Sequence, residues 1–204
     1  MMVLSGINVT VQNNMKLLVF LLLFPFFVFS QNDTIIKKKN YRVKYSQKYK
    51  QPLWVEYSVK TKECTTTRKG LVFYPEKGVI TSNDIDYDNN EYDKGHMVPA
   101  ADFCHDKVLM YQTFSYLNCA LQHYHLNRGV WKELEELERE YGKKDSLLIK
   151  IDILFNNKTN KSKGNSLIPS GFRKTIVFYS TKKKLVYEFP NITPNKSLNF
   201  YLKK

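Results

Sequence analysis

Hydrophobic and polar residues alternate along several short stretches of the chain, a pattern that indicates β-strands. The clearest stretch, residues 53–60, reads Leu-Trp-Val-Glu-Tyr-Ser-Val-Lys, with β-branched and aromatic residues in rough alternation. Four further stretches are rich in similar residues, at 70–74, 146–155, 175–179 and 184–189. We predict a strand in each of the five.

A longer period marks the clearest helix, residues 127–141. Val130, Leu134 and Leu137 recur there at i, i+4 and i+7 with Glu and Lys between them, and Gly142 supplies a stop signal. Strands that flank a central helix predict the α+β class, and neither a linker nor an internal repeat divides the chain.

Residues 31–51 are rich in Lys and Tyr, with low apolar content. We expect a mobile arm or an irregular segment there. Together with the rest of the mature chain, this segment belongs to one predicted domain, residues 31–204.

The N-terminus has the organisation of a secretory signal. Met15–Lys16 form a positive region, residues 17–29 are apolar, and the small residue Ser30 stands at the expected cleavage point. A membrane span needs ~20 apolar residues, so a cleaved signal peptide over residues 1–30 is favoured over a stable membrane anchor. Residues 1–14 resemble translation from an upstream start codon. The predicted location is secreted or periplasmic.

Lys and Arg outnumber Asp and Glu by 32 to 19, which gives a net charge of +13. This surplus suits a polyanionic partner such as nucleic acid. It equally suits a basic protein that its charge keeps soluble, and composition leaves both readings open.

The chain has three cysteines, Cys64, Cys104 and Cys119. Their odd number leaves at least one thiol without an intramolecular partner, and their spacing matches no zinc site. We interpret them as packing residues or one disulfide bridge, with no catalytic thiol.

The chemistry centres on His96, in the segment Asp93-Lys94-Gly95-His96. Hydrolysis of a phosphodiester needs a base that activates water, a cation that neutralises developing charge, and donors to the phosphate oxygens. Histidine suits the base. A lone histidine is weak evidence, although Gly95 would let the backbone take a tight or positive-φ conformation beside it.

Asn127 and Glu135 accompany His96 at the start of the predicted helix. The amide oxygen of Asn127 is a hard ligand suited to a hydrated Mg²⁺, but the same side chain could cap the helix. Glu135 stands about two turns later, roughly 12 Å along the helix axis. That spacing suits a residue that orients metal-bound water, or an i,i+4 partner of Arg139.

Four ordered segments resemble the DNA/RNA non-specific endonuclease family, the ββα-metal nucleases. Residues 93–96 are similar to the family's Asp-Arg-Gly-His, and residues 99–102 to its Pro-Ala-Ala-Asp. Residues 113–122 follow its Thr-Phe-x-x-Ser-Asn-x-x-Pro-Gln pattern in part. Residues 126–135, Leu-Asn-Arg-Gly-Val-Trp-Lys-Glu-Leu-Glu, match its last motif in full.

The resemblance implies a ββα-metal nuclease fold, with a central antiparallel sheet, flanking helices and a metal-site helix that starts near Asn127. It implies that His96 activates water, that Asn127 is the protein ligand to Mg²⁺ (with Mn²⁺ as a substitute), and that Glu135 orients metal-bound water. Asn118 would support His96 or the phosphate, and Arg68 would stabilise the phosphate. The implied substrates are DNA and RNA, cut without sequence preference.

Three residues depart from the family pattern. Lys94 replaces an arginine, which exchanges a planar fork for a point charge in the phosphate contact. Leu117 and Leu121 replace a serine and a proline. An alternative interpretation is therefore a catalytically weakened nucleic-acid-binding module of the same fold. A role as effector or competence factor, with an inhibitor protein as partner, is a further reading that the sequence does not test.

Overall fold

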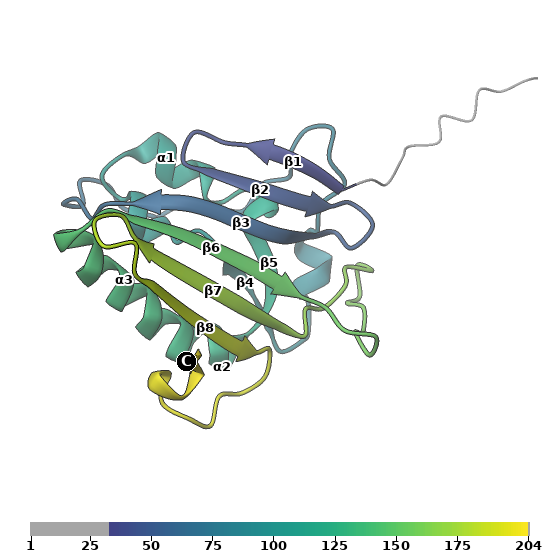
Figure 1. Cartoon of the computed structure of the whole chain (residues 1–204). Coiled ribbons are helices and arrows are strands. Elements are labelled where there is room, and N and C mark those ends of the chain that lie inside the picture. Colours follow the sequence, from purple (N-terminus) through teal and green to yellow (C-terminus); the bar gives the residue numbers. More distant parts are fainter. Residues whose placement is uncertain (1–32, 204) are drawn as a thin grey trace, which may run out of the picture. The chain divides into compact units, whose positions relative to one another are not determined.

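A seven-stranded antiparallel sheet forms the centre of the protein (Figure 1). The computed structural model describes residues 33–203; the predicted signal peptide, residues 1–30, lies outside the described residues. The strands, in their order across the sheet, are β1 (Asp33–Lys37), β2 (Tyr41–Ser46), β3 (Gln51–Val59), β6 (Leu147–Leu154), β7 (Gly171–Phe178), β8 (Lys184–Pro190) and β9 (Leu202–Lys203).

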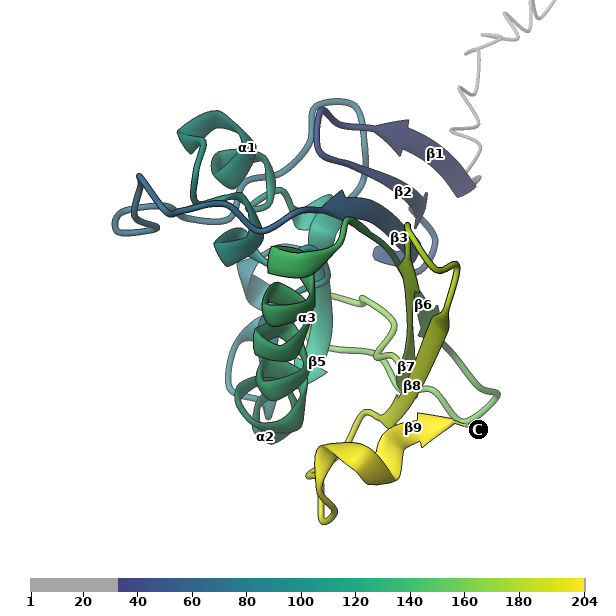
Figure 2. The ribbon, with the colours of Figure 1, turned by 60° about the vertical axis from the view of Figure 1, so that its left-hand side comes forward.

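The helices and a two-stranded ribbon pack on one face of this sheet (Figure 2). The ribbon pairs β4 (Tyr92–His96) with β5 (Cys119–His123). The α-helices are α1 (Lys107–Gln112), α2 (Tyr124–Leu126) and α3 (Lys132–Lys144), and a π-helical turn (Asn127–Trp131) joins the last two. Short 3-10 turns lie at Asp84–Tyr87, Ala100–Phe103, Tyr116–Asn118 and Leu198–Tyr201. Within residues 33–203, no helix has the length and apolar character that a membrane crossing requires.

The core lies between the sheet and α3. Trp131 and Leu134 are fully buried there. The Trp131 ring meets Phe172 of β7 and Phe189 of β8 edge-on, with ring centroids 5.5 and 5.7 Å apart. Aromatic pairs in this arrangement add to the stabilisation from buried area. The start of α3, beside the ribbon, is thereby fixed to the sheet.

The expected irregular segment at residues 31–51 is wrong, because β1 and β2 occupy most of it. Tyr41, Val43 and Tyr45 are buried on the core side of β2, whereas Arg42 points to solvent and Lys44 is only half-buried. This is a period-2 strand pattern in which tyrosine serves as the core residue. A low aliphatic content therefore concealed it.

The strands predicted at 53–60, 146–155, 175–179 and 184–189 are confirmed as β3, β6, β7 and β8. The strand predicted at 70–74 is wrong. Only Tyr74 forms an isolated bridge, with Ser115, while Gly70 takes a positive φ of 81° and Val72 is exposed. The segment is a loop that packs through its aromatic side chains.

The predicted helix is confirmed, with two corrections at its ends. Helical structure already begins at Tyr124, and it is interrupted at Gly129, where φ is −102° and ψ is −119°. Gly142 does not stop α3, which continues to Lys144. A side chain at Gly142 would meet Thr61, so a glycine is needed there for close packing.

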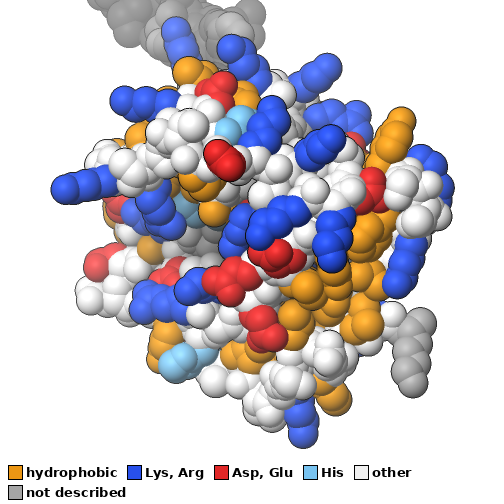
Figure 3. All heavy atoms as spheres, turned by 90° about the vertical axis from the view of Figure 1, so that its left-hand side faces the viewer, with side chains coloured by type: hydrophobic (Ala, Val, Ile, Leu, Met, Phe, Trp, Pro, Cys, Tyr) orange, Lys and Arg blue, Asp and Glu red, His pale blue; other side chains and the backbone are white. Residues whose placement is uncertain are grey.

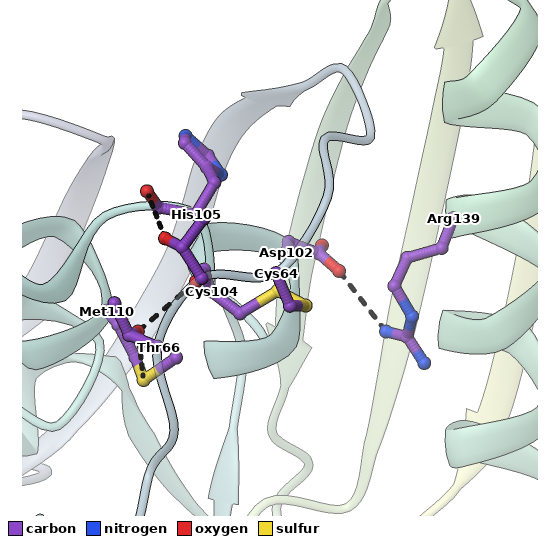
Figure 4. The surroundings of a disulfide bond; sticks show 8 residues. Cys64, Thr66, Asp102, Cys104, His105, Met110 and Arg139 are labelled. Atoms are coloured by element: carbon purple, nitrogen blue, oxygen red, sulfur yellow. Dashed lines mark hydrogen bonds and ion pairs between the residues drawn. A yellow bond between two sulfur atoms is a disulfide. The ribbon is translucent and has the colours of Figure 1, made fainter.

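Cys64 and Cys104 form a disulfide (Figure 4), which confirms the reading of one bridge. Cys119 is a buried free thiol. The bridge fixes the loop that follows β3 to the segment before α1. Thr65 and Thr66 also donate backbone hydrogen bonds to the Cys104 carbonyl.

Replacing both bridged cysteines with serine should lower the free energy of unfolding by about 4 kcal/mol. The expectation follows from the chain entropy of a closed loop with a sequence separation of 40 residues. Denaturant unfolding of the double variant measures it, with Cys119→Ser as the single-thiol control. A double variant as stable as the native protein would contradict the expectation.

Candidate functional site

The β4–β5 ribbon positions His96 at the end of β4. Gly95 lies opposite Ala120, and His96 lies opposite Cys119. Gly95 does not adopt a positive φ, so that alternative of the expectation is wrong. A Cβ at Gly95 would instead clash with the side chain of Gln122 on β5. The glycine is required because the two strands pack closely beside the histidine.

His96 lies between two aromatic rings, with its ring centroid 4.7 Å from that of Phe73 and 4.8 Å from that of Phe114. Its Nε2 atom is buried and has no hydrogen-bond partner among residues 33–203. Burial, and then the positive charge of Arg68, lower the pKa of His96 to about 3. The imidazole is therefore neutral near pH 7, which is the form that can accept a proton.

Asn118 is completely buried and binds backbone only. Its Oδ1 accepts from Val98 N at 2.8 Å, and its Nδ2 donates to the carbonyls of Val98 and Thr113 at 3.0 and 2.9 Å. The Asn118 carbonyl also accepts from Met97 N. Asn118 thus holds the backbone that follows His96, and its side chain is committed to that task.

Asn127 is the first residue of the π-helical turn, one position after the N-cap residue Leu126, so it does not stand at the N-cap position. Its Nδ2 donates to Asp93 Oδ2 at 2.9 Å. A carboxylate can only accept, so this contact assigns the amide nitrogen to the Asp93 side and turns Oδ1 away from it. Oδ1 has no protein donor in residues 33–203 and is available as a ligand.

Asp93 organises two neighbours. Arg128 donates to both of its oxygens, from Nε at 2.8 Å and from a terminal guanidinium nitrogen at 2.6 Å. Burial raises the pKa of Asp93, but the hydrogen bonds from Arg128 and Asn127 outweigh it and hold the pKa below its usual value. Asp93 is therefore an anion that fixes the side chains of Asn127 and Arg128.

Lys94 forms an ion pair with Asp84. Its ammonium also lies 5.8–5.9 Å from the ring centroids of Phe73, Tyr87 and Tyr116. These contacts hold a positive charge at the position where the family pattern has an arginine.

Glu135 lies apart from these groups. Its Oε1 accepts a hydrogen bond from Trp131 Nε1 at 3.0 Å. Burial raises the pKa of Glu135 to about 8, with Lys174 the largest opposing influence. Arg139, its alternative partner from the sequence, pairs instead with Asp102 at 3.2 Å.

One open cleft of about 500 Å³ collects most of the predicted site. The side chains that line it are Arg68, Phe73, Tyr87, Tyr92, Asp93, Lys94, His96, Asn127 and Arg128. Four of the six predicted site residues are among them, and Asn118 and Glu135 are not. Asp93 and Arg128 were not predicted, although both stand inside the motifs that drew attention to their neighbours.

The donor set of this cleft fits a mostly hydrated divalent cation. Within residues 33–203, no group of three or more His, Cys, Asp and Glu side chains could enclose a metal ion. Mg²⁺ commonly keeps several waters and takes few protein ligands, all of them oxygens. The free Oδ1 of Asn127 is such a ligand, and the Asp93 carboxylate adds negative charge nearby.

The sequence model of one family, described as DNA/RNA non-specific endonuclease, matches residues 25–203. The chain belongs to this family. The predicted membership is thereby confirmed.

Two vertebrate relatives are both named mitochondrial nuclease EXOG. That of Danio rerio is 31% identical over 112 residues, which is 52% of this chain and 33% of the relative. That of Xenopus laevis is 29% identical over 110 residues, which is 52% of this chain and 31% of the relative. The matched stretches span about a third of these curated relatives.

The fold also matches a solved structure, described as the complex of EndoG with EndoGI and the mechanism of EndoG inhibition. The TM-score is 0.76 at 21% identity, over 85% of this chain and 81% of that chain. The α+β class and the ββα-metal fold are both confirmed.

Proposed function

We propose that the protein is a secreted endonuclease that hydrolyses DNA and RNA without sequence preference, with Mg²⁺ as cofactor and Mn²⁺ as a substitute. One observation carries the proposal. A neutral histidine with an unpartnered nitrogen shares a cleft with an asparagine whose free oxygen is oriented by Asp93. Family membership agrees with this chemistry.

In the proposed reaction His96 takes a proton from a water molecule as the water oxygen attacks phosphorus. The bond between phosphorus and the leaving oxygen breaks, and that oxygen takes a proton from solvent. Arg68 and Lys94, which line the same cleft, bind the phosphate oxygens and offset their charge. Asn127 would hold the cation, which would neutralise the negative charge that develops on the phosphate and the leaving oxygen. Asp93 positions Asn127 for this role.

Glu135 acts indirectly in this scheme. Its side chain accepts a hydrogen bond from Trp131 at the start of α3, and through this contact it would position the turn that carries Asn127. Its role in orienting metal-bound water rests on the family resemblance alone.

The absence of sequence preference follows from the kind of contact available. The cleft offers Arg68, Lys94 and Arg128 as cations, which bind phosphates in any sequence. We expect affinity to fall steeply as salt concentration rises.

Export is supported by two features of different kinds. The segment ending at Ser30 has the order of a signal peptide, and the Cys64–Cys104 disulfide suits an oxidising compartment. An inhibitor protein is a proposed partner, because the EndoG of similar fold was solved in a complex with EndoGI that concerns EndoG inhibition.

Cleavage assays test the proposal directly. The purified protein is incubated with supercoiled plasmid and with RNA, first with Mg²⁺ and then with EDTA. We expect both substrates to be cut with Mg²⁺ and to remain intact with EDTA. Intact substrates under both conditions would refute the nuclease proposal.

Substitutions of Lys94 distinguish the two interpretations of the protein, an active nuclease and a weakened nucleic-acid-binding module. Because Asp84 and three aromatic rings already hold the ammonium, Lys94→Arg should change kcat/KM by less than about tenfold, whereas Lys94→Met should lower it about tenfold to a hundredfold through the lost phosphate contact. Steady-state kinetics on a defined duplex measure both. A native protein that binds DNA without cutting it, and is activated by Lys94→Arg, would establish the weakened module.

A further inference from the structure

A second basic cavity, of about 510 Å³, lies where the β1–β2 turn, the end of β3 and the residues after Cys104 meet. We call it the lysine groove and define it by Lys37, Lys39, Lys60, Lys62 and His105. It shares no lining residue with the cleft that contains His96. Figure 3 shows Lys and Arg side chains gathered over the upper part and centre of one face of the molecule.

The four lysines of the groove have no carboxylate partner in the described part of the chain. Lys38 and Arg42, which also line the cavity, pair with Glu76 and Glu56 at 2.5 Å each. By contrast, no ion pair within residues 33–203 involves the four exposed lysines that define the groove. Their mutual repulsion favours an anionic ligand that contacts several of them together.

Some residues that line the groove also carry buried polar atoms without a hydrogen-bond partner. Nine buried side-chain nitrogen and oxygen atoms in residues 33–203 lack a partner, and four of them belong to groove residues: Asn40 Oδ1, Tyr57 Oη, Asp102 Oδ2 and His105 Nδ1. Tyr57 and Asp102 are 3% and 4% exposed. These four atoms are themselves buried, so contact with a ligand falls to the exposed lysines.

One short loop, residues 60–68, lines both the groove and the cleft. Lys60 and Lys62 lie in the groove, and Arg68 of the same loop lines the cleft. The Cys64–Cys104 disulfide anchors the loop between them, and His105 follows directly on the bridge (Figure 4). Arg68 is six positions after Lys62, so their Cα atoms are at most ~21 Å apart.

We propose that the lysine groove is a second binding site for nucleic-acid phosphates, which holds a long substrate while the cleft acts on it. The inference rests on the proposed nuclease function and extends it to substrate length. At a rise of ~3.4 Å per nucleotide, ~21 Å corresponds to about six nucleotides. A substrate of about six nucleotides or more is therefore long enough to contact both sites.

The test compares two variants with the same change in charge. The groove variant is K37Q/K39Q/K60Q/K62Q. The control variant, K158Q/K182Q/K183Q/K184Q, removes four exposed lysines that line neither cavity. Both carry His96→Ala to prevent cleavage, and binding of a 24-base-pair duplex and of a tetranucleotide is measured by fluorescence anisotropy at several KCl concentrations.

We expect the groove variant to bind the duplex at least about tenfold more weakly than the control variant. The slope of log Kd against log[KCl] should fall by about 2 to 4, since each lost phosphate contact contributes ~0.9. Tetranucleotide affinity should differ less between the two variants, because a tetranucleotide presents fewer phosphates than the duplex. Circular dichroism confirms that both are folded, which is expected because all eight lysines are exposed.

Equal duplex affinities and equal salt slopes in the two variants would overturn the proposal, because the lysines would then act only through net charge. A groove variant that loses tetranucleotide affinity to the same extent would also overturn it. Binding is measured without turnover, so a protein that holds duplex in the groove but cuts nothing would refute the nuclease function and leave the groove site standing.

Discussion

His96→Ala should reduce kcat about 10²- to 10⁴-fold, the range that a general base contributes, while the affinity for DNA stays within about threefold. The Nε2 atom has no protein partner to replace, and the aromatic neighbours Phe73 and Phe114 support the ring without sharing its proton. Nuclease kinetics and anisotropy on one duplex give the two values. His125→Ala, which removes an exposed histidine outside the cleft, is the matched control.

The pH dependence of the native protein provides a second check on His96. Burial and Arg68 lower the pKa of His96 to about 3, so the base stays deprotonated as the pH falls through the ordinary value of 6.5. We expect kcat to show no loss with a midpoint near 6.5. A tenfold decrease per pH unit below 6.5 that His96→Ala abolishes would show that the imidazole titrates normally.

The same pKa has a consequence for stability. Between pH 6.5 and about 3 the unfolded chain takes up a proton at this histidine and the folded chain does not. The free energy of unfolding of the native protein should therefore decrease as the pH falls through this window. His96→Ala should show a smaller decrease. Equal pH dependence in the two proteins would contradict the lowered pKa.

Sequence periodicity predicted the strands and the helix whose buried positions are occupied by aliphatic residues. β6 alternates buried Leu147, Ile149 and Ile151 with less buried residues, and the pattern was readable. β2 was not predicted, because tyrosines occupy two of its buried positions. The loop containing Val72 was mistaken for a strand, because its apolar residues pack as separate contacts and not as one face of a sheet.

The site was predictable where a residue's task is chemical and local. His96, Lys94, Arg68 and Asn127 line one cleft, as their residue types implied. The role of Asn118 was harder to predict, because an amide side chain can bind either a phosphate or backbone groups. Only the structure shows that it bonds to the Val98 backbone. Asp93 was missed because its role depends on two partners, 34 and 35 residues away, that the fold brings to it.

Substitution of Asn127 should have the second large effect. Swapping the amide and the carboxylate between positions 93 and 127 provides a specific test. Asn127→Ala removes the proposed cation ligand, and we expect cation affinity to fall at least about a hundredfold, with a parallel loss of cutting at limiting Mg²⁺. Asn127→Asp should not restore binding, although a carboxylate is a stronger ligand, because it would face Asp93 where Nδ2 now donates at 2.9 Å. Isothermal titration with Mn²⁺ measures affinity without reference to activity.

The double variant Asp93→Asn/Asn127→Asp tests whether Asn127 is a ligand of the cation or only stabilises the start of the helix. It restores one donor and one acceptor between the two positions, so that the new carboxylate can present its second oxygen to the cation. We therefore expect the double variant to bind Mn²⁺ at least about tenfold more tightly than Asn127→Asp alone, as partners of metal ligands change affinity by 10- to 100-fold. A residue that only capped the helix would change stability by ~1 kcal/mol and leave Mn²⁺ affinity unchanged in all three variants. That outcome would remove Asn127 from the metal site, because its contact with Asp93 would then serve the turn alone.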